Sequence, residues 1–77
     1  MWEWDCSAPG RSGGGVRGDE QWALQAAESW MREHRAIAAR VAPVLLDVVE
    51  LAYVPAGQAL EAVVHGNDRI TWRPAAA

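Results

Sequence analysis

The chain has 77 residues, of which 51% are hydrophobic, and it carries a formal net charge of −3. This length predicts one domain with a small core, and the hydrophobic content argues against disorder along most of the chain. The acidic balance and the lack of any basic run argue against nucleic acid as the main partner, because nucleic-acid-binding domains usually carry a basic stripe.

Residues 1–5 alternate, with Trp2 and Trp4 on one side and Glu3 and Asp5 on the other. A period of two predicts a strand, and its backbone hydrogen bonds require that it joins a sheet formed by later segments. In one interpretation, Trp2 and Trp4 face a helix as part of the core. In the alternative, they lie exposed on an edge and bind a protein partner or a second copy.

The next segment, residues 7–18, is S-A-P-G-R-S-G-G-G-V-R-G. Its many glycines predict a flexible loop. The segment has neither the Walker spacing nor the G-x-G-x-x-G pattern of phosphate-binding loops. No nucleotide cofactor is therefore expected here.

A helical period begins after Asp19, which is a suitable N-cap. One face of this helix collects Ala23, Leu24, Ala27, Trp30, Met31 and His34. We expect the helix to end between residues 35 and 41, because Ala42 precedes Pro43 and therefore avoids helical angles.

The apolar run over residues 41–55, V-A-P-V-L-L-D-V-V-E-L-A-Y-V-P, is compatible with a helix or a strand. Its β-branched residues favour a strand over residues 43–54, with a bulge between Asp47 and Glu50 where the alternation breaks. The following V-P-A-G, residues 54–57, predicts a type I turn.

The segments L-E-A-V-V-H, G-N-D and R-I-T-W-R form a clear hairpin signal. A three-residue loop over residues 66–68 gives the register with one consistent apolar face. The predicted pairs are Val64 with Ile70, Ala62 with Trp72, Val63 with Thr71 and Glu61 with Arg73. Residues 74–77 predict a frayed tail.

The expected fold is α+β, a single domain over residues 1–77 with one helix packed on a small, mostly antiparallel sheet in the order β-α-β-β-β. If residues 43–54 were helical, the fold would instead be mostly α with a C-terminal hairpin.

Cys6, His34 and His65 are the candidate metal ligands, or a nucleophile with its base. They lack the close spacing of metal sites, and a domain of this size has little room for a catalytic pocket. We therefore expect no enzyme, metal or cofactor. The single cysteine, the acidic start and the absence of a membrane-length apolar run favour a cytoplasmic protein without membrane contact.

By elimination, the sequence indicates a small non-enzymatic protein-interaction or regulatory module that binds a protein partner or itself. The alternative is a nucleic-acid-binding accessory protein that uses the Arg69–Arg73 strand together with Arg11 and Arg17, since arginines hold phosphate and tryptophan stacks on bases. The candidate interaction residues are Trp2, Trp4, Arg69, Trp72 and Arg73.

The segments WEWDC, DEQWALQAAESWMREH and GNDRITWRP, with a glycine-rich turn after the first, extend over most of the chain. In this order they resemble a group of short actinobacterial proteins that begin with a WxWDC-like segment. The resemblance implies a cytoplasmic protein from a GC-rich actinobacterium. It implies no activity and no functional residues.

Overall fold

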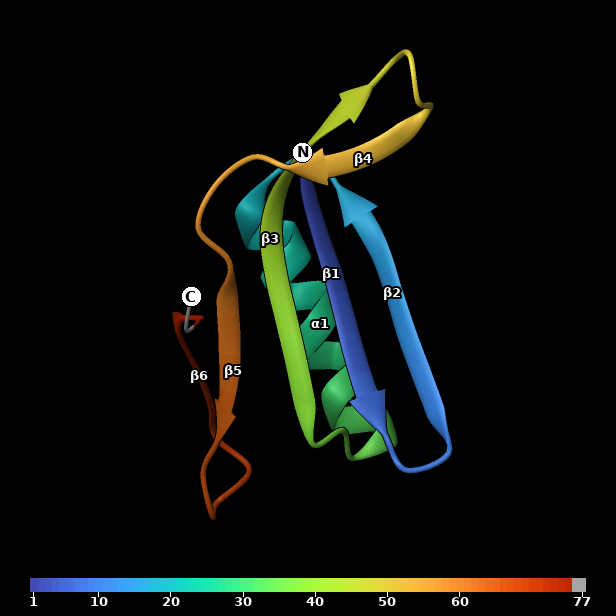
Figure 1. The fold of residues 1–77 in the computed structure, drawn as a ribbon. Coiled ribbons are helices and arrows are strands. Elements are labelled where there is room, and N and C mark those ends of the chain that lie inside the picture. Colours follow the sequence, from blue (N-terminus) through green and yellow to red (C-terminus); the bar gives the residue numbers. More distant parts are fainter. Residues whose placement is uncertain (76–77) are drawn as a thin grey trace.

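The structure, a computed structural model, describes residues 1–75. Within that range the elements are β1 (Trp2–Ala8), β2 (Arg11–Arg17), α1 (Glu20–His34), β3 (Ala38–Asp47), β4 (Ala52–Pro55), β5 (Leu60–Val64) and β6 (Ile70–Pro74). The antiparallel sheet has the order β2-β1-β3-β5-β6, and β4 pairs with β3 outside this path. Helix α1 lies across one face, against β1, β2 and β3 (Figure 1). The expected α+β class is confirmed, and the mostly α alternative is wrong.

The glycine-rich segment is a strand and not the expected loop over residues 7–18. Ser7 and Ala8 complete β1, the chain turns at Pro9 and Gly10, and Arg11–Arg17 return beside β1 as β2. The left-handed φ of Gly10, +78°, allows this tight turn. The element order is β-β-α-β-β-β-β, with one more strand than expected before the helix and one more after it.

Two tryptophan rings explain why β2 is rich in glycine. A Cβ atom at Gly13 would lie 2.2 Å from Nε1 of Trp30, and one at Gly15 would lie 3.0 Å from Nε1 of Trp4. Glycine inside a strand often marks such a close approach. The glycines that suggest a loop therefore leave space for the rings of Trp30 and Trp4 to lie on strand β2.

Helix α1 buries the face that the sequence predicts. The Oδ1 atom of Asp19 accepts a hydrogen bond from the N–H of Trp22 at 3.0 Å, which confirms the N-cap. The fully buried positions are Ala23, Ala27 and Met31. The helix ends at His34, just before the expected range, because Arg35 adopts the left-handed conformation with φ 53° and its N–H donates to the last turn.

The core lies between α1 and the strands β1 and β3. Trp4 and Cys6 of β1 and Val41 of β3 are buried there, and Trp2 is half-buried against the same cluster. Strand β1 pairs with β3, as expected for a first strand that joins the later sheet. The N-terminal tryptophans therefore pack toward the core, as the first interpretation predicts.

The apolar run over residues 43–54 forms a hairpin and not a single bulged strand. Strand β3 begins earlier than expected, at Ala38, and continues to Asp47; residues 48–51 form a turn, and β4 returns along the second half of β3. The preference for strand over helix is confirmed. The predicted bulge is wrong, because the chain reverses direction where the alternation breaks.

The predicted type I turn at residues 54–57 is also wrong. Pro55 ends β4, and the N–H of Ala56 donates to the carbonyl of Pro43 at 2.9 Å. The chain therefore continues along the edge of β3 toward β5 and does not reverse.

The C-terminal hairpin has the predicted register. The pairs are Val64 with Ile70, Val63 with Thr71, Ala62 with Trp72 and Glu61 with Arg73. Asp68 has the left-handed φ, 63°, that the three-residue loop requires. Pro74 and Ala75 do not belong to the expected frayed tail, because Pro74 is part of β6 and the N–H of Ala75 donates to the carbonyl of Ala59. The rest of that tail lies outside the described residues.

Candidate interaction surface

The β3–β4 hairpin extends beyond one end of the sheet (Figure 1). The pairing of β1 with β3 begins at Trp2 and Pro43, and the pairing of β5 with β3 begins at Leu60 and Val41. Past these positions, β4 is the strand that pairs with β3. We refer to residues 45–54 as the arm. The arm contributes to an elongated shape with extents of 43 × 24 × 22 Å.

Asp47 shapes the turn of the arm. Its Oδ1 atom accepts hydrogen bonds from the N–H groups of Val49 at 2.9 Å and Glu50 at 3.1 Å. Leu51 then takes a left-handed φ of 54°. An aspartate that binds the backbone two residues ahead favours a turn, so the chain reverses direction here without glycine.

The arm is apolar on both faces and at its tip. Because side chains alternate along a strand, the paired Leu45 and Val54 share one face, and the paired Leu46 and Tyr53 share the other. Seven large apolar side chains are exposed, with exposed fractions between 37% and 85%: Leu45, Leu46, Val48, Val49, Leu51, Tyr53 and Val54. Exposed apolar side chains that gather on one element in this number often mark an interaction site.

The charged residues of the arm are Asp47 and Glu50, and both are acidic. The carboxylate of Asp47 is already bound by the turn amides. No Lys or Arg occurs between Arg40 and Arg69. The arm therefore suits an apolar protein surface and offers no cation for a phosphate backbone.

The sequence-based reasoning missed the arm as a surface, because a dense apolar run is normally buried. One signal in the sequence favours the hairpin: residues 41–55 make a 15-residue run, whereas strands usually have about five or six residues. Two short strands and a turn fit this length. Nothing local indicates that the hairpin would lie beyond the sheet.

The structure does not bring the predicted tryptophans onto one surface. Trp4 is buried, with 7% of its surface exposed, and Trp2 is half-buried beside the core. The Nε1–H of Trp72 donates to Oε2 of Glu28 at 3.2 Å, which ties β6 to the helix. These rings therefore serve mainly to hold the strands and α1 together.

Arg69 and Arg73 are exposed on the β5–β6 hairpin. The Nε of Arg73 donates to Oε1 of Glu61 at 2.7 Å in an ion pair across the two strands. Trp72 and Arg73 are adjacent in β6, so their side chains point to opposite faces of the sheet. The structure therefore separates the stacking ring from the neighbouring cation.

The thiol of Cys6 is buried, with 1% of the residue exposed, and donates to the carbonyl of Ala27 at 3.6 Å. Burial, and to a smaller extent the carboxylate of Asp5, raise the pKa of Cys6 from 9.0 to about 11. A buried thiol that stays protonated is a poor nucleophile and a poor metal ligand.

The two histidines lie apart from this thiol, in exposed hydrogen bonds. The Nη1 of Arg11 donates to Nδ1 of His34 at 3.1 Å, and Nε2 of His65 is hydrogen-bonded to Oγ1 of Thr71 at 2.9 Å. Over residues 1–75, no group of three or more His, Cys, Asp or Glu side chains is placed to hold a metal ion.

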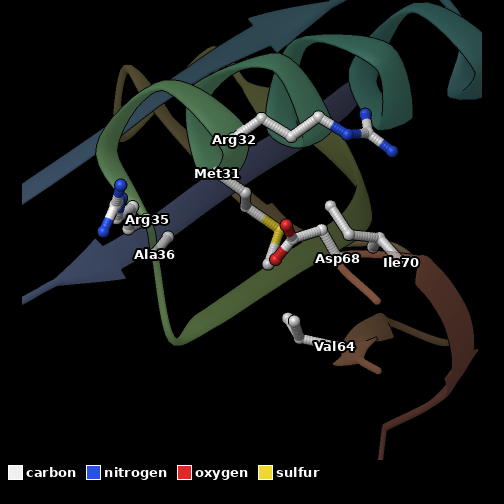
Figure 2. Close-up of a pocket in the computed structure, with 7 residues that line it drawn as sticks. All are labelled: Met31, Arg32, Arg35, Ala36, Val64, Asp68 and Ile70. Carbon is white, nitrogen blue, oxygen red and sulfur yellow. The ribbon is translucent and has the colours of Figure 1, made fainter. Parts of the chain in front are cut away.

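A hollow of about 650 Å³ lies between the end of α1 and the β5–β6 hairpin (Figure 2). It is lined by Met31, Arg32, Arg35, Ala36, Val64, Asp68 and Ile70. Figure 2 shows Arg32 and Arg35 pointing away on opposite sides. Ligand pockets combine an apolar lining with several converging polar groups, and these arginines do not converge.

In the part of the chain that the structure describes, no helix is long and apolar enough to cross a membrane. Comparisons with protein-family models, curated proteins and solved structures found no match. The resemblance to short actinobacterial proteins therefore stays a prediction.

Proposed function

We propose that this chain is a small, non-enzymatic protein-interaction module and that the arm is its binding surface. The supporting observation is the set of seven exposed apolar side chains on a hairpin that extends beyond the sheet. Burying one Val or Leu side chain completely is worth roughly 1.5–3 kcal/mol. A partner that covers the arm therefore gains a large apolar contribution that the isolated chain leaves in water.

The rest of the fold gives the arm a fixed base. The first half of β3 is held between β1 and β5, and its Val41 is completely buried under α1. The arm continues this same strand, so its direction is set by the core. A preorganised surface binds with a smaller loss of conformational entropy than a flexible tail.

We favour a protein partner over nucleic acid because the arm has no cation and because Arg73 is paired with Glu61. We favour the cytoplasm as the compartment because the chain's single cysteine cannot form an internal disulfide. A regulatory role fits a domain that presents one binding surface and little space for chemistry.

The proposal is tested with a tagged chain in lysate from cells that express it naturally. Three baits are compared by quantitative mass spectrometry: wild type, the arm variant Val49→Glu with Leu51→Glu, and Ile37→Glu. Ile37 is the matched control, because it is 74% exposed but lies outside the arm. We expect wild type and the control to enrich the same protein, and the arm variant to lose it. Enrichment that is equal for all three baits, or none at all, would contradict the proposal.

A further inference from the structure

We infer that the arm binds a second copy of this chain, arm against arm, in a two-fold symmetric dimer. This inference rests on the proposed function and names the partner. A two-fold contact uses the same patch on both copies. Each arm therefore provides the apolar surface that the other arm needs, and no second apolar patch is required elsewhere on the molecule.

The distribution of the exposed apolar side chains supports this partner. Seven of them lie on the arm, on both of its faces and in its turn, so a two-fold contact covers one face and part of the turn of each arm. The other exposed large hydrophobic side chains of the described range are scattered over different elements: Met1, Trp22, Ile37 and Val64. The arm is therefore the element of the described range on which exposed apolar side chains gather.

The backbone of β4 supports the same partner. Over residues 1–75, β4 pairs with β3 alone, so its outer edge has unpaired hydrogen-bonding groups. Edge strands usually avoid pairing with another chain by being very short or by carrying charges, proline or bulges. Strand β4 is short, with four residues, and its proline is the last of them. Residues 52–54 of β4 are Ala-Tyr-Val and carry no charge, and Pro55 lies at the base. Two β4 strands can pair antiparallel about a two-fold axis.

A lipid surface fits the arm less well. Segments that lie on membranes usually combine apolar side chains with Lys or Arg, which attract anionic lipids. The arm has no basic residue, and Glu50 is located in the turn at its tip. These acidic and apolar side chains favour contact with a second arm.

The test uses the purified full chain in sedimentation equilibrium, from about 5 to 500 µM. We expect wild type to show twice the 8.4 kDa chain mass at the upper concentrations. Leu45→Glu and Leu46→Glu place a charge on opposite faces of the arm. The variant whose face is covered in the dimer should raise the dimer dissociation constant at least about 100-fold. Ile37→Glu should leave it unchanged. Circular dichroism confirms that each variant keeps its fold.

A second measurement needs no variant. Amide hydrogen exchange of wild type at the two ends of the concentration range should show protection gained in residues 45–54 and not in β2 or β6. A chain that stays monomeric, or a dimer unaffected by Leu45→Glu and Leu46→Glu, would overturn the inference. So would a monomer that sediments with phosphatidylserine-containing vesicles. A monomer whose arm still captures a different protein from lysate overturns this inference alone, and the proposed function survives.

Discussion

Replacing Gly13 by alanine tests whether β2 is a strand on which a tryptophan ring lies. The new Cβ would lie 2.2 Å from Nε1, 2.5 Å from Cε2 and 2.9 Å from Cδ1 of Trp30. Real Cβ contacts are not this short, so the ring or the strand must move. The ring cannot move freely, because it packs against the core and lies 4.3 Å from the ring of His34.

Two opposing terms set the size of the effect. Overpacking of a well-filled site costs roughly 1–3 kcal/mol. Replacing glycine by alanine reduces the entropy of the unfolded chain, which stabilises by about 0.4–1 kcal/mol. For Gly13→Ala we therefore expect a net loss of about 1–2 kcal/mol in the free energy of unfolding. In a domain of this size, each kcal/mol lowers the Tm by roughly 4–8 °C.

Urea denaturation followed by tryptophan fluorescence measures this loss. Gly66→Ala is the matched control, because its Cβ would have no neighbour within 4 Å. The control should gain about 0.5 kcal/mol. In the background of Trp30→Leu, the cost of Gly13→Ala should disappear. If Gly13→Ala is as harmless as Gly66→Ala, Trp30 does not lie on β2 and the packing argument is wrong.

Three further changes test the core, the helix contact and the arm. Because the pKa of Cys6 is raised in the folded chain, the folded thiol keeps its proton at a pH where the unfolded thiol loses it. The free energy of unfolding should therefore fall as the pH rises from 9.0 to about 11, and Cys6→Ala should not show this fall. If the urea midpoint of wild type changes no more than that of Cys6→Ala over this range, the thiol is not buried. Glu28→Ala removes the acceptor of the Trp72 indole and should lower the free energy of unfolding by about 1 kcal/mol in urea denaturation. Arg32→Ala removes only the exposed ion pair with the same Glu28 and should lower it by less than about 0.5 kcal/mol. Equal losses for the two variants would argue against the indole hydrogen bond. Asp47→Ala removes two hydrogen bonds from the turn of the arm and should speed amide exchange in residues 48–51 about five-fold without affecting β1; unchanged exchange there would refute this role of the carboxylate.

The elements that the sequence predicts well are those whose signals are local. The buried face of α1 follows from the helical period, and its start follows from the side chain of Asp19. The register of the β5–β6 hairpin follows from matching apolar faces around a three-residue loop, with Asp68 in the left-handed conformation. In each case the deciding contacts lie within a few residues or one turn.

Strand β2 could not be predicted, because its reason is distant in the sequence. Strand β2 pairs with β1, and Gly13 and Gly15 leave the space that the rings of Trp30 and Trp4 occupy on it. Composition alone gives the opposite prediction, a flexible loop. No local sequence pattern indicates which ring approaches which glycine. Strand β2 therefore cannot be predicted before the positions of α1 and β1 are known.

The candidate site was missed for a related reason. Apolar side chains such as Leu45 and Val49 are normally assigned to the core, whereas tryptophan is frequent at binding hot spots, so the sequence predicts Trp4 and Trp72 as interaction residues. In the structure Trp4 is buried and Val49 is 85% exposed. The sequence alone does not indicate which apolar segment stays exposed to solvent once the helix has covered its face of the sheet.

The most direct test of the arm as a self-binding surface is an NMR titration of isotope-labelled chain with excess unlabelled chain. If the arm binds a second arm, the shifts will be concentrated in residues 45–54 and will fade in Leu45→Glu or in Leu46→Glu, whichever alters the covered face. Constant signals throughout the titration, or shifts confined to the Arg69–Arg73 strand, would contradict this binding.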